Sequence, residues 1–483
     1  MSSTVYNNVK SLLRETRLEF SKFLRIQHRE MDLSENLEDI MNLCGLTTIG
    51  AGYADFLIDN DIIIFPMFDS SLSSAVLAAA APCLISTNYR PYGGVLLINP
   101  GLNFNKENTN LYMKNLLLHE ITHILAFHPY YFNALKMNKT MNSKPYITSS
   151  RVLTQARKHF NCNSITGVQL ENQGGDGSAG SHWESRYMLG DFMISTDYPD
   201  STISDITLAL FEDTGFYKVN YYSGGLFKFG KNKGCNFLSD KCIQNEEAAF
   251  DEFCDEAGEA KCSSSRSLKS SCYLITYSYN LDQNYQYFSN PRKGGYSPAD
   301  YCPVPFERHS SDSYFQKHCR IKKANLTDYG ETMGDNSLCF MSTLTPDSVE
   351  ELTTQVPICY EFECDTSNSQ INIKVGSSTI TCPTDGSAPT IPSGFKGTIE
   401  CPKYDEICSS NDGLICNDMF SCFTQLAEKD GYNYQTTYSD YSGAAAVIDE
   451  EEDYEDYYIV RRSSSYNITF NFALLLILFI IIL

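Results

Sequence analysis

Two histidines and one glutamate lie within five residues of an apolar run, in the order His119-Glu120-Ile121-Thr122-His123. If this run is helical, His119 and His123 leave the same face one turn apart, where two ring nitrogens can bind one metal ion. Glu120 then lies beside the metal without being a ligand, which suits a general base. The spacing therefore indicates a zinc site for hydrolysis, although a buried helix with two hydrogen-bonded core histidines would show the same five residues.

A catalytic zinc site needs a third protein ligand and an open position for water. The compact pattern H-E-x-x-H-x-x-G-x-x-H fails here, because its third histidine is a proline and its glycine is Ala126, while His128 is one residue out of register. Two alternatives remain. Glu184 could act as a ligand from a downstream helix, or His182 could reach the metal from the end of the glycine-rich loop 174–180. Taken alone, His182 would equally suit a loop histidine without a metal.

Besides the helix motif, three downstream features follow in a definite order: Ser181-His182-Trp183-Glu184, then Met193 eleven positions after His182, then Ala209-Leu210-Phe211-Glu212-Asp213-Thr214-Gly215-Phe216-Tyr217. This order resembles the leishmanolysin family of surface zinc metalloproteases, over roughly residues 10 to 425. This resemblance implies that His119, His123 and His182 bind one Zn²⁺, that Glu120 is the general base, and that Met193 belongs to a methionine turn beneath the metal. On its own, Met193 would be a core methionine.

One residue departs from the family pattern. Ala126 stands where the family usually has glycine. If that position requires a positive φ, alanine would strain the turn by about 1 kcal/mol. We also recognise no pro-segment before the first predicted helix, so latency through a cysteine switch is not assigned.

Local patterns predict an α+β fold, in which strands precede a long active-site helix. The resemblance refines this to a metzincin-like zinc protease domain, followed by a disulfide-rich, mostly irregular or β C-terminal domain. The predicted elements are an amphipathic helix over 5–27, strands over 59–68 and 94–99, a loop or short helical turn over 74–81, a helix over 108–127, mixed structure over 130–172, and a helix over 203–216 that stops at Gly215.

Composition places the chain in an oxidising compartment. The 483 residues include 18 cysteines, and without paired C-x-x-C knuckles these indicate disulfides and an extracellular setting. Fifteen cysteines follow residue 225, so one of them pairs with an earlier cysteine or stays free. The formal charge of −22 disfavours nucleic acid as a partner.

The two ends of the chain suggest a membrane-anchored surface protein. The first ten residues lack the apolar core of a secretory signal, so we expect the N-terminus to be incomplete. Small residues at 463–465, a polar spacer and the apolar run 473–483 form a GPI-attachment pattern. A tail-anchored helix lengthened upstream through Asn467 is the alternative. The sequon at Asn138 fits secretion but is weak evidence.

These shifts in composition divide the chain into five parts. We predict an N-terminal catalytic subdomain with the active-site helix (1–128), a central subdomain supplying the third histidine and the methionine turn (129–225), a cysteine-rich domain (226–425), an acidic stalk (426–465) and a hydrophobic GPI-attachment signal (466–483).

The predicted function is zinc-dependent endoproteolysis at the cell surface, with protein or peptide substrates and Glu120 as the base. The first alternative is a catalytically inactive adhesion or coat protein built on the same fold. The second is a disulfide-rich structural coat protein in which the histidine motif is accidental.

Overall fold

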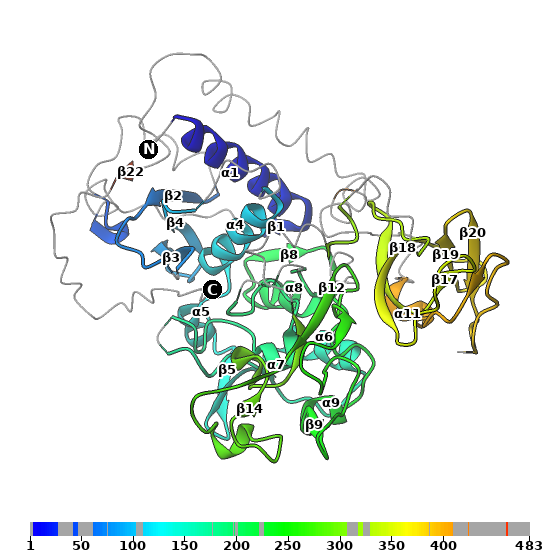
Figure 1. Cartoon of the computed structure of the whole chain (residues 1–483). Coiled ribbons are helices and arrows are strands. Elements are labelled where there is room, and N and C mark those ends of the chain that lie inside the picture. The colour runs from blue at the N-terminus through cyan, green and yellow to red at the C-terminus, as the bar shows by residue number, and fades with distance from the viewer. Residues whose placement is uncertain are drawn as a thin grey trace.

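A computed structural model describes residues 3–27, 42–46, 61–74, 76–102, 110–175, 177–196, 198, 201–221, 227–306, 317–321, 329–385, 387–408, 424 and 460–461. It contains both helices and strands, many of them short, with eight disulfide bonds among the described residues. Figure 1 shows strands β17 to β20 together at one side of the picture, with the short helix α11 (Tyr404–Ile407) beside them. The predicted stalk and the predicted GPI signal lie almost entirely outside the described residues.

The first predicted helix is present as α1 (Ser3–Phe23), followed by the short strand β1 (Leu24–Ile26). Val9 and Leu12 are buried against helix α4 (Asn110–Leu125), and the Glu19–Lys114 ion pair joins the two helices at 3.3 Å. β1 pairs antiparallel with β8 (Tyr217–Val219), so the start of the chain is tied to the segment beyond the third histidine.

A sheet in the order β22-β2-β4-β3 supports one face of α4. β2 (Ile63–Phe68) runs parallel to β4 (Pro91–Ile98), and β3 (Ala78–Ile85) pairs antiparallel with β4, while β22 (Val460–Arg461) joins β2. The prediction of a loop or helical turn over 74–81 was therefore wrong for its last four residues, which form the start of β3. A Cβ added to Gly94 would lie 2.3 Å from Ile124, so this glycine allows α4 to approach the sheet closely.

Helix α4 lies between two hydrophobic cores. Leu117 and Ile124 pack with the sheet and α1, whereas Leu118 and Ile121 belong to the larger cluster formed with the central segment. The predicted helix over 108–127 is thus confirmed in type, and it ends two residues before its predicted C-terminal end. Because both long faces of α4 are buried, its polar side chains are held in an apolar surround.

The described residues of the central segment form four helices and a small antiparallel sheet in the order β5-β6-β7. Gly215 has φ +78° and ends α8, as predicted. The helix α6 was not predicted, because residues 130–172 were interpreted as mixed structure. The bounds are α5 (Pro129–Ala134), β5 (Asn138–Met141), β6 (Lys144–Ile147), α6 (Ser150–Phe160), β7 (Val168–Gln169), α7 (Ser185–Met188) and α8 (Asp205–Asp213).

The segment after residue 227 consists mainly of short strands and disulfides. A further hydrophobic core, separate from the two cores at α4, lies within 338–408 and surrounds the sheet β16-β18-β19-β20. The bounds are α9 (Asn236–Ser239), β9 (Ile243–Gln244), β10 (Glu247–Ala248), β11 (Ala260–Cys262), β12 (Lys269–Tyr273), β13 (Ile275–Thr276), η3 (Gln283–Tyr285), β14 (Lys293–Gly294), η4 (Ser297–Ala299), β15 (Val304–Phe306), β16 (Ser337–Ser342), β17 (Thr345–Pro346), β18 (Val356–Asp365), β19 (Gln370–Val375), β20 (Ser378–Cys382), β21 (Phe395–Lys396) and α11 (Tyr404–Ile407).

The disulfides agree with the cysteine count. Cys162 pairs with Cys235, which confirms that one of the fifteen later cysteines bonds to an earlier one. The remaining pairs are 44–83, 242–302, 254–272, 262–339, 319–359, 364–408 and 382–401. The core around α8 continues through Phe253 to Phe306, so the predicted boundary near residue 225 does not interrupt it. The division into domains stays a prediction.

No helix within the described ranges is both long enough and apolar enough to cross a membrane.

Candidate metal centre

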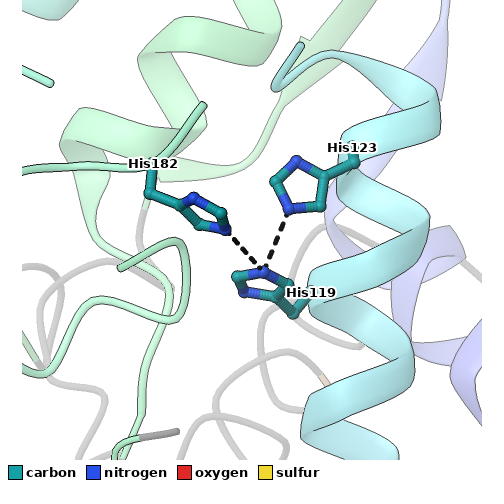
Figure 2. Close-up of side chains that lie close together, drawn as sticks. All are labelled: His119, His123 and His182. Carbon is teal, nitrogen blue, oxygen red and sulfur yellow. Dashed lines mark hydrogen bonds between the residues drawn. The ribbon is translucent and has the colours of Figure 1, made fainter. Parts of the chain in front are cut away.

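The structure brings His119, His123 and His182 together. α4 places the first two on one face, one turn apart, and the strand-like segment after the glycine loop delivers the third (Figure 2). The Nε2 atom of His119 lies 3.0 Å from Nε2 of His123 and 3.3 Å from Nε2 of His182. All three rings are buried, and they form the one group of three potential metal ligands within the described part of the chain.

The outer nitrogen of each ring faces a backbone carbonyl. The Nδ1 atoms lie 2.5 Å from Phe192 O for His119, 2.8 Å from Phe127 O for His123, and 3.2 Å from Ser178 O for His182. Because a carbonyl oxygen only accepts, each Nδ1 must carry the hydrogen. In a neutral ring the Nε2 atom then has a lone pair and no proton.

The rings are neutral at pH 7, since burial lowers the pKa of His119 to about 4 and that of His182 to about 3, and it also lowers the pKa of His123. Three nitrogen lone pairs therefore converge without a hydrogen between them, an arrangement that a cation would stabilise. Two ligands of a tetrahedral zinc, each about 2.0–2.1 Å from the metal, lie about 3.3 Å apart. The observed separations of 3.0 and 3.3 Å fit such an ion.

Glu120 is fully buried next to His119, and neither of its carboxylate oxygens has a hydrogen-bond partner. Burial raises the pKa of this carboxyl to about 8. Buried polar atoms without partners are rare in folded proteins and often mark a functional site. A cation at the three imidazoles would favour the charged carboxylate and lower this pKa again.

A tight turn after α7 forms another wall of the site. Met193 is buried there, one residue beyond the carbonyl that receives His119. Its own carbonyl accepts the backbone N–H of Trp183 at 2.9 Å, which fixes the turn against the segment carrying His182. The resemblance predicted a methionine turn at this position, and the structure places Met193 in a turn beside the histidine cluster.

The glycine loop folds back onto the segment that carries His182. Gly174, Gly175 and Gly180 have φ values of +80°, +71° and +79°, which glycine adopts without strain. The N–H of Gly180 donates to Glu171 O at 2.8 Å, and the N–H of Glu171 donates to His182 O at 2.9 Å. The loop therefore holds His182 in place through backbone bonds.

Two alternative ligands lie elsewhere. His128 accepts the N–H of Tyr130 through Nδ1 at 3.1 Å and caps α5, so the histidine one residue out of register is not in the cluster. The carboxylate of Glu184 accepts hydrogen bonds from the Arg186 N–H and the Gln169 side chain, both at 3.1 Å. The group that converges contains His182 and not Glu184.

Ala126 is compatible with its backbone conformation. It is fully buried and is absent from the residues with positive φ. The N–H groups of Ala126 and Phe127 both donate to Thr122 O at 2.9 Å, which turns the chain out of α4 without a left-handed residue. The strain considered from the sequence therefore does not arise at this position.

A family profile described as leishmanolysin matches residues 20–413. The chain belongs to the leishmanolysin family. It is 29% identical over 406 residues to a leishmanolysin homolog of Crithidia fasciculata, a match covering 80% of this chain and 61% of the relative. It is 29% identical to leishmanolysin of Leishmania tropica, covering 72% and 55%, and 30% identical to a leishmanolysin-like peptidase of Drosophila melanogaster, covering 55% and 44%.

The matches span about half to three fifths of these leishmanolysin relatives. Among the described residues, the three-histidine cluster is a group that could hold a metal ion. The many disulfides are consistent with an extracellular setting.

Sequence reasoning missed several groups that support the histidine cluster. The carbonyl of Phe192 orients His119, and any residue type could supply it, so the sequence contains no signal for it. Asp191 and Thr207 anchor the turn through side-chain hydrogen bonds, and a buried acid beside a tight turn could have suggested them. Tyr217 lies in the motif quoted for the resemblance, but its role was not assigned.

Proposed function

We propose that this protein is a zinc-dependent endopeptidase. The observation that carries the proposal is the convergence of three buried Nε2 lone pairs beside Glu120, whose carboxylate oxygens lack hydrogen-bond partners. A structural histidine cluster would not require an unsatisfied carboxyl next to it, whereas metal-assisted hydrolysis uses both features.

His119, His123 and His182 would hold the ion through their Nε2 atoms. Zinc at this position supplies Lewis acidity toward a peptide carbonyl and makes a coordinated water more acidic. Glu120 accepts the proton of the attacking water at its carboxylate and then delivers it to the leaving amine. The carbonyls of Phe192, Phe127 and Ser178 keep the three rings in the tautomer that offers Nε2 to the metal.

The proposal extends to the fold type and the location. A helix with two ligands, a distant third histidine and a methionine turn correspond to a metzincin-like catalytic domain. We place the enzyme at the cell surface, held by a GPI anchor, and two features support this. The disulfides indicate an oxidising compartment, and residues 463–483 have the pattern of an attachment signal. Cleavage of a surface-labelled form by phosphatidylinositol-specific phospholipase C tests the anchor.

The decisive experiment combines zinc analysis with proteolysis. We expect one zinc per purified chain, and cleavage of casein that 1,10-phenanthroline inhibits. Glu120→Gln should retain zinc but reduce kcat/KM by about 10²–10⁴-fold, because it removes the base and leaves the ligands. Full activity in that variant would refute the assignment, and zinc binding without any casein cleavage by the wild type would favour the inactive adhesion protein.

Histidine variants test the ligand set. His182→Ala should lose zinc, whereas His159→Gln should keep it. His159 is a useful control because its Nε2 donates to Phe229 O at 2.8 Å, outside the cluster. Equal zinc content in the two variants would remove His182 from the metal centre.

A further inference from the structure

A network of hydrogen bonds lies behind the histidine cluster, and the fully buried carboxylate of Asp191 is its centre. The Oδ1 atom accepts the backbone N–H of Met193 at 2.8 Å. The Oδ2 atom accepts the hydroxyl of Thr207 at 2.8 Å and the backbone N–H of Ser204 at 3.1 Å. One side chain therefore joins the methionine turn to the first turn of α8.

The bond from Met193 to Asp191 fixes the peptide group between them. An aspartate that accepts the N–H two residues ahead closes a local turn. The carbonyl within that turn belongs to Phe192, and it receives the Nδ1 hydrogen of His119. The direction of this carbonyl determines both the orientation of the His119 ring and the nitrogen that faces the metal.

The same carboxylate is connected to the third ligand. The indole N–H of Trp183 donates to Thr207 Oγ1 at 2.7 Å. Thr207 has a single hydroxyl hydrogen, which it donates to Asp191, so its oxygen is free to accept from the indole. Because Trp183 directly follows His182, the buried indole fixes the backbone from which the His182 side chain extends.

We infer that Asp191 is a positioning residue for the metal centre, which sets the geometry of His119 through the Phe192 carbonyl and of His182 through Thr207 and Trp183. The inference rests on the proposed zinc site. It assigns no contact between Asp191 and the ion or the substrate. A carboxylate is needed at this position because all three of its partners donate, and an amide would place its NH₂ group against a donor.

The test measures zinc affinity of the full chain by competition with a chelator, together with the visible absorption of the cobalt-substituted protein. Asp191→Asn should weaken zinc binding by about 10–100-fold, the range found for outer-sphere partners of histidine ligands. Its cobalt spectrum should shift, and kcat should fall more than KM changes. Asp213→Asn is the matched control, since Asp213 accepts two backbone N–H groups of α6 at 3.0 Å and lies outside the network.

A second pair of variants covers the case in which Asp191→Asn does not fold. Thr207→Val removes the hydroxyl but keeps the side-chain shape, and Thr207→Ser restores it. We expect weaker zinc binding in the valine variant and near-normal binding in the serine variant. The inference would be overturned if the zinc affinities of Asp191→Asn and Asp213→Asn agreed within twofold and those of Thr207→Val and Thr207→Ser did so as well. A wild type that binds no zinc would instead refute the proposed function.

Discussion

The hydroxyl of Tyr217 lies 3.2 Å from the carbonyl oxygen of Leu125 and donates to it. The hydroxyl of Tyr131 donates in the same way to the carbonyl of Ile124 at 2.9 Å. The last carbonyls of a helix have no partner within the helix, so these two buried tyrosines satisfy groups at the end of α4 that would otherwise lose water without compensation. The end of the helix that carries His123 is thus fixed from β8 and α5.

Tyr217→Phe should lower the free energy of unfolding by about 1–3 kcal/mol, because it leaves a buried carbonyl unsatisfied. Urea denaturation of the metal-free protein measures this. Tyr360→Phe is the control, since the Tyr360 hydroxyl donates to Tyr329 O at 3.2 Å in the separate core within 338–408. We expect both variants to lose stability, and only Tyr217→Phe to weaken zinc binding. Unchanged stability in Tyr217→Phe would contradict the role in ending α4.

Glu120→Gln should stabilise the metal-free protein at neutral pH. Burial raises the folded-state pKa of Glu120 from 4.5 to about 8. The protonated carboxyl therefore contributes its full stabilisation below pH 4.5, and this contribution is lost progressively as the pH rises from 4.5 through 8. Glutamine does not titrate, so the variant should gain on the order of 3 kcal/mol at pH 7.

Chelator-treated wild type and variant, unfolded in urea at several pH values, provide the measurement. The two stability curves should coincide below pH 4.5 and separate above it. Added zinc should narrow the gap, because a cation stabilises the charged carboxylate. Parallel curves over this range would mean that Glu120 is not desolvated as the structure shows.

Ala126→Gly should not improve the enzyme. Ala126 is buried with a negative φ, so glycine gains nothing from its left-handed freedom. The substitution removes a buried methyl group and adds backbone freedom to the unfolded chain, which together cost about 1–2 kcal/mol. Thermal unfolding and casein cleavage measure the two effects, and a rise in either stability or kcat/KM would show that the position prefers glycine.

Removal of the Cys162–Cys235 disulfide should destabilise the central segment. This bond follows the end of α6 and spans 73 residues of sequence. A Cys162→Ser/Cys235→Ser protein should lose about 2–5 kcal/mol. The matching replacement of the Cys382–Cys401 disulfide, in the separate core within 338–408, is the control. We expect the first replacement to weaken zinc binding and the second to leave it unchanged. A reversed order would contradict a role for the packing of α6 on α8 in supporting the histidine cluster.

The sequence alone predicted the active-site helix well, because the spacing of His119 and His123 and the apolar residues around them both follow a helical period. His182 is 59 residues beyond His123 (182 − 123), and its recruitment depends on tertiary folding. Reasoning from the residues alone left His182 and Glu184 as alternative third ligands, and only the family resemblance favoured His182. Local patterns do not encode such a distance.

Two errors in the fold have physical reasons. β3 begins with alanines, which favour helices, but their small side chains are buried where α4 packs on the sheet, so packing overrides propensity. α6 did carry a signal, since Val152, Ala156 and Phe160 recur every four residues and are all buried. When hydrophobic periodicity is considered over the whole stretch 130–172, the strands and turns on either side of α6 obscure its helical period.

The proposed third ligand, His182, belongs to a segment distant from α4 in the sequence, and this has a consequence for folding. An ion held by both His123 and His182 would close a loop of 59 residues, as a covalent cross-link between them would. For a loop of that length, the entropy removed from the unfolded chain corresponds to about 4 kcal/mol. The free zinc concentration of the compartment would then determine how much of the newly made chain survives quality control, before any substrate is cleaved.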